Sequence, residues 1–133
     1  TFETTLGGNT IADLLEQAAR AGHKVRIVFV GLESAEKHIE RVAARVARGG
    51  HDIADEAIRE RYKNSRLNLI RLLPVLDELL LYDNSDDADP DTGLAPSLKR
   101  LLHVKGGAVV FIEPKPNTAC GWSKPILAAA LGL

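Results

Sequence analysis

Three arginines form a row on one face of a predicted helix over residues 34–48. Arg41, Arg45 and Arg48 fall within about 60° of one another when each residue turns the helix by 100°. Inside the helix, the positions three and four residues away from them hold no acid. Stacked like charges cost roughly a few tenths of a kcal/mol per pair. The row therefore indicates a site for an anion or, alternatively, a solvated face.

Two glycines, at residues 49–50, interrupt the helical pattern directly after the arginine row. A hinge at these glycines would let Arg45 and Arg48 converge with Arg61 of the next helix on one ligand. Lids of phosphoryl-transfer enzymes close in this way. Arg41 is farther from the glycines, so we expect it to contribute little.

A structural role is the alternative for Arg61. Its helical phase places it beside the apolar stripe of its helix, where a partly buried ion pair with Asp52 or Asp55 would stabilise it. The sequence leaves both roles open.

Glu3 is the second candidate for chemistry. In open α/β sheets, ligands bind beyond the carboxyl ends of the strands, and residues 3–8, 31–34 and 83–85 each follow a predicted strand. An acid at an apolar strand end is costly to bury unless it holds a donor such as a sugar hydroxyl. The alternative is that Glu3 is exposed or bonded to the backbone.

The elements that must position these residues alternate between strand and helix patterns. The first elements are a strand end at 1–6, a helix capped by Asn9 or Thr10 and closed by Gly22, and a strand at 25–30 that helices cover on both faces. Two helices follow: one is capped by Ser34, and the other is long, carries an apolar stripe from Ile58 to Leu80 and is kinked at Pro74. The remaining elements are a strand at 79–85, a hairpin across 105–107 and a terminal helix. This order predicts an α/β fold with a parallel sheet, right-handed crossovers and an added C-terminal β-hairpin.

The composition is typical of one soluble domain over residues 1–133. A net charge of −1 gives no general attraction to nucleic acid or membranes, and no apolar run reaches the about 20 residues that a bilayer span needs. The single cysteine, Cys120, fits a reducing compartment, so we expect a cytoplasmic location. Cys120 and the histidines are too scattered for metal-ligand spacing, so we expect no metal site. We expect the acidic stretch 86–97 to be a mobile loop.

Five stretches together resemble the zeta-toxin family of P-loop kinases, which includes members labelled predicted ABC-type ATPases. They are "FETTL", "VFVGLES", "RVAARVARGGHDI", "IRERYKNSRLNL" and "LYDNS", in this order and spacing, and they cover residues 2 to about 85. The resemblance implies a P-loop nucleoside-kinase-like parallel sheet. For the characterised toxins it also implies ATP-dependent phosphorylation of UDP-N-acetylglucosamine at the sugar 3′-hydroxyl, with ATP and Mg²⁺ as cofactors of the complete protein.

The resemblance also implies roles for single residues. Glu3 and Thr5 match the stretch that holds the sugar nucleotide. Arg45, Arg48 and Arg61 match the lid arginines that bind the nucleotide phosphates, and Arg45 and Arg48 are the catalytic candidates. Toxins can carry an arginine after the Thr-Leu pair, where this chain has Gly7, so the acceptor can differ from that of the toxins.

The family's phosphate loop and catalytic aspartate precede the "FETTL" stretch, and these 133 residues contain neither. The sequence also begins without methionine, so we expect a piece of a longer kinase whose N-terminal strand and phosphate loop are missing. Alone, it should be inactive and bind no cofactor, because the loop lysine supplies much of the charge neutralisation. Expected partners are a nucleotide sugar, an antitoxin and a second copy through exposed sheet surface. The alternative function is a non-enzymatic domain that binds a nucleotide sugar or a protein.

Overall fold

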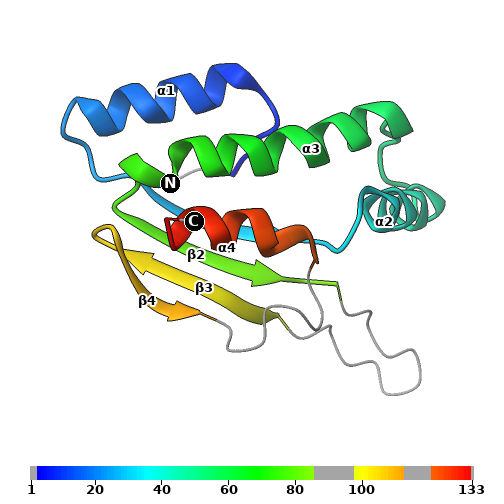
Figure 1. Ribbon diagram of the computed structural model, residues 1–133. Coiled ribbons are helices and arrows are strands. Elements are labelled where there is room, and N and C mark those ends of the chain that lie inside the picture. The colour runs from blue at the N-terminus through cyan, green and yellow to red at the C-terminus, as the bar shows by residue number, and fades with distance from the viewer. Residues whose placement is uncertain (1–2, 86–97, 113–120, 133) are drawn as a thin grey trace.

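Four helices and four strands make up most of the described chain. The computed structural model describes residues 3–85, 98–112 and 121–132 (Figure 1). The elements are α1 (Asn9–Arg20), β1 (Arg26–Gly31), α2 (Ala35–Ala47), α3 (Asp55–Leu72), the 3₁₀ turn η1 (Leu73–Val75), β2 (Glu78–Asp83), β3 (Lys99–Lys105), β4 (Ala108–Ile112), the 3₁₀ turn η2 (Gly121–Ser123) and α4 (Lys124–Ala130). The expected loop 86–97 and Cys120 lie outside the described residues.

The strands form one mixed sheet in the order β1-β2-β3-β4. β1 and β2 are parallel and are joined through α2 and α3, whereas β2–β3 and β3–β4 are antiparallel. The α/β class and the hairpin at Gly106 and Gly107 are therefore confirmed. Parallel pairing is limited to β1 and β2 within the described residues, and the hairpin strand β3 joins the far edge of β2 in the opposite direction, so the sheet is mixed.

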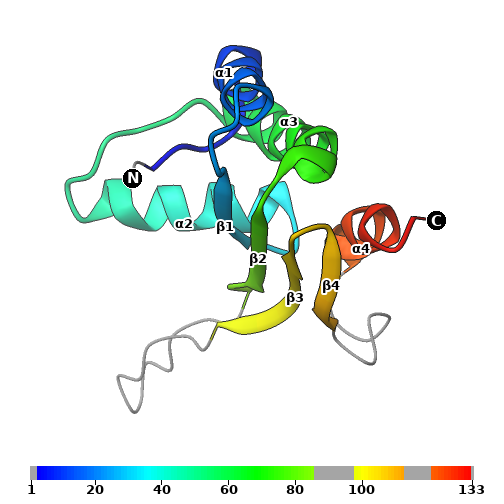
Figure 2. The same cartoon turned by 90° about the vertical axis from the view of Figure 1, so that its left-hand side faces the viewer.

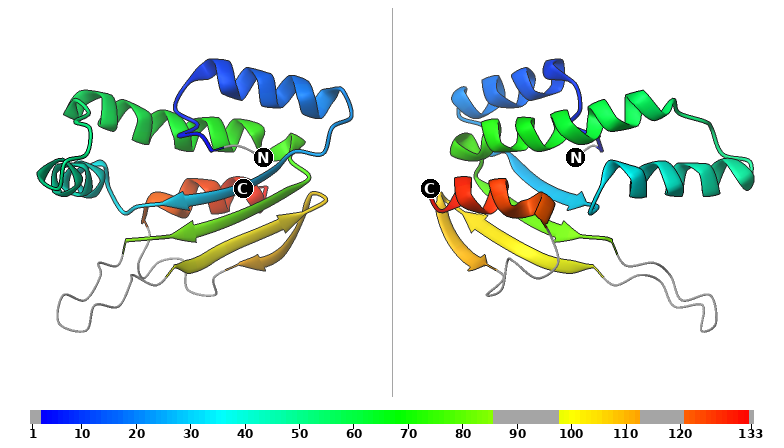
Figure 3. Two further views of the ribbon diagram at one scale, coloured as in Figure 1. Left: turned by 180° about the vertical axis from the view of Figure 1, so that it is seen from behind. Right: turned by 45° about the vertical axis from the view of Figure 1, so that its right-hand side comes forward.

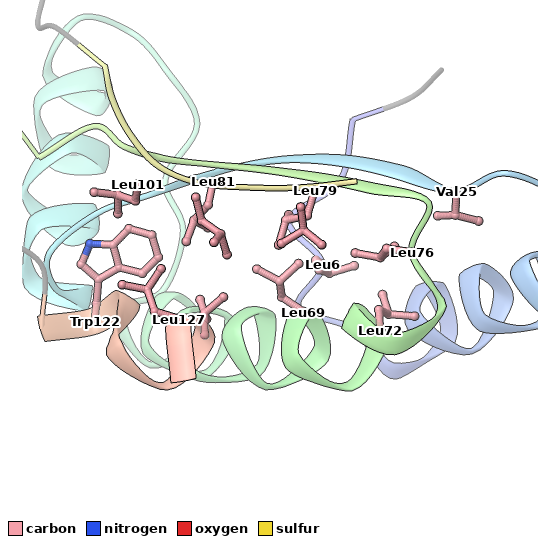
Figure 4. Close-up of a cluster of buried hydrophobic side chains, with 13 residues drawn as sticks. Leu6, Val25, Leu69, Leu72, Leu76, Leu79, Leu81, Leu101, Trp122 and Leu127 are labelled. Atoms are coloured by element: carbon pink, nitrogen blue, oxygen red, sulfur yellow. The ribbon is translucent and has the colours of Figure 1, made fainter. Parts of the chain in front are cut away.

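Helices α1, α3 and α4 lie on one side of the sheet (Figure 2). Leu69 and Leu72 of α3 are fully buried against Leu79 and Leu81 of β2, with Leu6 between the layers (Figure 4). α2 lies instead beyond the carboxyl ends of β1 and β2 (Figures 1 and 3). The fold therefore separates a packed leucine core from an end of the sheet that α2 borders.

The opposite face of β1 differs from the expected double cover. Val28 and Val30 are 64% and 45% exposed in the described part of the chain. The continuous apolar sequence of β1 therefore predicts more burial than this strand has in the part of the chain that the structure describes.

Three predicted boundaries need correction. Residues 3–6, the described part of the predicted strand end, form no strand. α1 has Gly8 at its N-cap, without a side-chain cap bond from Asn9 or Thr10. α3 ends at Leu72, because Pro74 lies in a 3₁₀ turn that begins at Leu73 and the chain then enters β2.

Candidate anion-binding site

A pocket of about 410 Å³ lies between α2 and the carboxyl ends of β1 and β2. Its lining combines the arginine row with residues that follow the two strands: Leu32, His38, Arg41, Ala44, Arg45, Arg48 and Asn84. This is the edge of a parallel strand pair where ligands bind in open α/β sheets. The volume falls in the range of small-molecule sites, roughly 300–1,000 Å³.

Both ends of α2 are fixed by local hydrogen bonds. At its start, the Ser34 hydroxyl accepts a hydrogen bond from the Lys37 N–H at 3.1 Å, as the sequence predicted. At its end, Gly49 has φ +96°, and the Gly50 N–H donates to the Arg45 carbonyl at 2.8 Å. The Gly49 N–H also donates to the Val46 carbonyl, at 2.9 Å. These two bonds make a Schellman cap, so the paired glycines end the helix directly after Arg48.

Arg45 and Arg48 are exposed at the mouth of this pocket. Within the described residues, neither guanidinium has a carboxylate partner at salt-bridge distance. Arg41, which we expect to contribute little because it is farther from the glycines, lines the same pocket. The predicted row is therefore one wall of a pocket, and within the described chain Arg45 and Arg48 have no carboxylate that neutralises them.

His38 is the titratable member of the pocket and lies one turn before Arg41. It is half-buried, and its ring meets the Tyr62 ring edge-on at 5.5 Å between centroids and 66° between planes. Burial lowers the pKa of His38, and the positive charges of Arg41 and Arg45 lower it further. At neutral pH the imidazole is uncharged and offers one donor and one acceptor.

Tyr62 joins α3 to this pocket. Its hydroxyl donates to the Leu32 carbonyl at 3.0 Å, and the Arg66 guanidinium lies 4.4 Å from the ring centroid. Burial raises the pKa of Tyr62, with an opposing effect of Arg66, so the hydroxyl stays protonated and can keep donating. Tyr62 thereby holds the strand end that carries Leu32 and also contacts His38.

The end of β2 is held from the other side by Trp122. The buried Asp83 carboxylate accepts hydrogen bonds through Oδ1 from Trp122 Nε1 at 3.2 Å and from the Ser85 hydroxyl at 2.5 Å. A Cβ at Gly31 would lie 2.3 Å from the indole, so glycine is required for this close approach. The Asn84 N–H donates to the Gly31 carbonyl at 2.8 Å, which keeps Asn84 beside the pocket.

Arg61 lies elsewhere and does not line the pocket with Arg45 and Arg48. It packs along the segment 3–8, where a Cβ at Gly7 would lie 3.0 Å from Cγ of Arg61. No described residue forms an ion pair with Arg61, so its predicted pairs with Asp52 or Asp55 are not formed.

Glu3 and Thr5 lie in an exposed segment that is anchored through its neighbours. The buried Leu6 adopts φ 55°, a strained value for a leucine, and the Asn68 side chain donates to its carbonyl at 2.8 Å. The Thr5 hydroxyl accepts from the Gly7 N–H at 3.4 Å, and Glu3 has no hydrogen-bonding partner among the described residues. The exposed alternative for Glu3 therefore describes this structure.

Two residues at or beside the pocket, His38 and Tyr62, escaped sequence reasoning. His38 shares the helical phase of the arginine row, so its spacing from Arg41 was an available signal. Asn84 belongs to the predicted segment 83–85 at a strand end. Tyr62 is 30 positions from Leu32, and only the fold brings the two together.

Comparison with known proteins gives one partial match. The chain is 37% identical over 61 residues to a protein of Haemophilus influenzae described as uncharacterized, and the match covers 46% of this chain and 44% of that protein. No family description and no solved structure matches the chain. Among the described residues, no helix has the length and apolar character needed to cross a membrane.

Proposed function

We propose that this chain forms the acceptor-binding and lid portion of a kinase similar to the zeta toxins. The reaction would transfer a phosphoryl group from ATP to a nucleotide sugar such as UDP-N-acetylglucosamine. The observation that carries the proposal is the pocket at the ends of β1 and β2, which Arg45 and Arg48 enter without carboxylate partners among the described residues. Catalysis of phosphoryl transfer consists mainly of positioning and charge neutralisation.

The phosphates of ATP fit the arginine pocket by chemistry. Guanidinium groups bind phosphate oxygens through paired N–H donors, and the pocket adds the His38 ring and the Asn84 amide. The described residues fit Mg²⁺ less well: Asp83 already accepts two hydrogen bonds through Oδ1, and no three described metal-binding side chains come together. We therefore assign phosphate contacts and no magnesium ligand.

The acceptor is assigned to the segment 3–8. Leu6 and Asn68 fix its backbone, while Glu3 remains exposed and able to accept a hydrogen bond from a sugar hydroxyl. Arg61 lies beside this segment, so we assign it to the acceptor side of the site and not to the ATP phosphates. The antitoxin partner and self-association through the exposed face of β1 remain proposals that no contact described here supports.

Binding measurements on matched variants test these assignments. Glu3→Gln should weaken UDP-N-acetylglucosamine binding by about tenfold or more, since a hydrogen bond to a charged group contributes roughly 1.5–3 kcal/mol. Tripolyphosphate affinity should not change, and Thr5→Val serves as a second acceptor-side variant. Equal losses for both ligands would show that Glu3 has a structural role.

The accessible arginines also favour a second candidate, a non-enzymatic domain that binds a nucleotide sugar or a protein partner. Arg45 and Arg48 can hold the diphosphate of a nucleotide sugar without any transfer reaction. Incubation of the full-length gene product with labelled ATP and UDP-N-acetylglucosamine separates the two. Labelled sugar nucleotide supports the kinase, and tight binding without labelling supports the binding domain.

A further inference from the structure

His38 is the pocket residue whose charge can change near neutral pH. On its own helix, Arg41 and Arg45 are close enough to influence its ring, and Arg48 lines the same pocket. From α3, Tyr62 covers one side of the ring. From the end of β2, the pocket receives the uncharged Asn84. The carboxylates Glu33, Glu36 and Asp83 lie close enough to Tyr62 to influence it, but none of them lines the pocket.

We propose that His38 is a ligand-contacting residue of the arginine pocket, and that a tetrahedral oxyanion entering the pocket brings a proton onto its ring. The inference rests on the proposed phosphate-binding function and adds a residue and a proton to it. The ring lies on the pocket wall beside arginines whose charge repels a proton while the pocket holds no anion. A dianion bound between the His38 ring and the arginines makes the local electric field favourable for a proton on the ring.

The charge balance gives the physical reason. Without an anion, burial and two arginines disfavour the imidazolium form, as the lowered pKa of His38 indicates. A bound dianion accepts a hydrogen bond from either form of the ring, and it favours the charged form because charge-assisted bonds are stronger. The proton comes from the solvent, and proton and anion binding must strengthen each other by the same factor.

Sulfate is the probe that isolates this effect, because its charge stays at −2 from about pH 5.5 to about pH 8.5, whereas phosphates titrate in that range. Sulfate affinity of the 133-residue chain would be measured by NMR titration across this range. We expect an increase of about tenfold as one proton is taken up towards the lower pH. Histidine resonances would report the pKa of His38 directly, and sulfate should raise it.

Two histidine variants provide the matched comparison. His38→Gln keeps a polar side chain but cannot gain charge, so its sulfate affinity should be nearly independent of pH. His23→Gln replaces an exposed histidine outside the pocket and should retain the pH dependence of the parent chain.

Each outcome has a distinct meaning. If sulfate binds through Arg45 and Arg48 but leaves the pKa of His38 unchanged, the inference is overturned and the phosphate pocket stands. If sulfate does not bind the 133-residue chain, the inference is overturned. If it binds equally well after Arg45→Ala and Arg48→Ala, the arginine pocket is not the anion site, and the proposed function fails together with the inference. The His38 resonance of the parent chain gives this answer even if His38→Gln does not fold.

Discussion

Two arginine environments in this molecule differ in where their counter-charges come from. Arg71 on α3 lies 2.5 Å from an Asp13 oxygen and 2.7 Å from a Glu16 oxygen, both on α1. The hydrogen bonds that Arg71 donates to the Asp13 and Glu16 carboxylates raise the pKa of Arg71. Arg45 and Arg48 on α2 have no such carboxylate within the described chain. Arg71 therefore joins two helices, whereas the α2 pair leaves its donors to a ligand.

The comparison shows that an arginine's role follows from the whole set of neighbouring elements. The acids that hold Arg71 come from 55 and 58 positions away in sequence. The absence of acids inside α2 was visible in the sequence, but the absence of acids from the other described elements was not. A cationic row becomes a candidate site only when the tertiary neighbours also fail to neutralise it.

Removal of both unpaired arginines should have the largest effect. Arg45→Ala combined with Arg48→Ala should weaken tripolyphosphate binding by about 100-fold or more, since each charge-assisted contact contributes roughly 1.5–3 kcal/mol. The melting temperature should stay the same or rise slightly, because like charges are removed. Calorimetry and thermal unfolding measure the two quantities on the same sample.

Arg71→Ala is the control for this double variant. It should lower the melting temperature slightly and leave tripolyphosphate affinity unchanged, because its partners belong to the protein. If Arg71→Ala weakens tripolyphosphate binding as much as the double variant does, the distinction between the two environments is lost.

A smaller effect is expected from the cap that places Arg48. Gly49→Ala forces a side chain into the left-handed region at φ +96°, which should lower the free energy of unfolding by about 1–2 kcal/mol. Gly121→Ala is the matched control, because Gly121 has no positive φ and has open space around its Cβ position. Urea unfolding gives both values, and equal stabilities would show that the cap does not constrain α2.

Replacement of Arg48 by lysine should have a smaller effect still. Lysine keeps the charge but loses the planar set of donors, so Arg48→Lys should weaken tripolyphosphate binding by about fivefold. If the full-length protein is the proposed kinase, its turnover should fall more than its ATP binding, because the contact matters most as charge spreads in the transition state. Equal affinities of the lysine variant and the parent chain would mean that charge alone accounts for the site.

Local patterns predicted the parts of the fold that local chemistry determines. β1 and β2 follow apolar β-rich runs, and the hairpin follows from Gly106 and Gly107, whose φ values of +59° and +81° suit glycine in a tight turn. The predicted end of the long helix was wrong, because Leu76 and Leu80 continue its helical stripe beyond Leu72. Pairing of β2 with β1 and β3 overrides that periodicity.

The site was predicted only in its cationic part. The arginine row follows from spacing on one helix, and the strand ends gave the region of Asn84. Convergence of Arg61 was predicted from a hinge, whereas the glycines cap α2 and Arg61 lies at Gly7. The positive φ of Leu6 has no local signal, because the buried Asn68 holds it from α3.

The smallest expected effect is the pH dependence of stability that His38 contributes. Its pKa is lowered in the folded state from the ordinary value of 6.5, chiefly by burial. Above pH 6.5 both states are mostly neutral at this residue. As the pH falls below that value, the unfolded chain takes up the proton first and stability is lost. Glu16 and Glu78, whose pKa values are lowered from the ordinary value of 4.5, titrate below that pH, so the window from about pH 7.5 to about pH 5.5 avoids their titration.

In chloride buffer, urea unfolding should show a smaller loss of stability for His38→Gln than for the parent chain across this window. Sulfate should also reduce the loss in the parent chain, because it binds the folded state with His38 protonated. If the pH dependence of stability is the same in both comparisons, the folded state does not disfavour protonation of His38. The contrast between the two arginine environments would then rest on Arg45 and Arg48 alone.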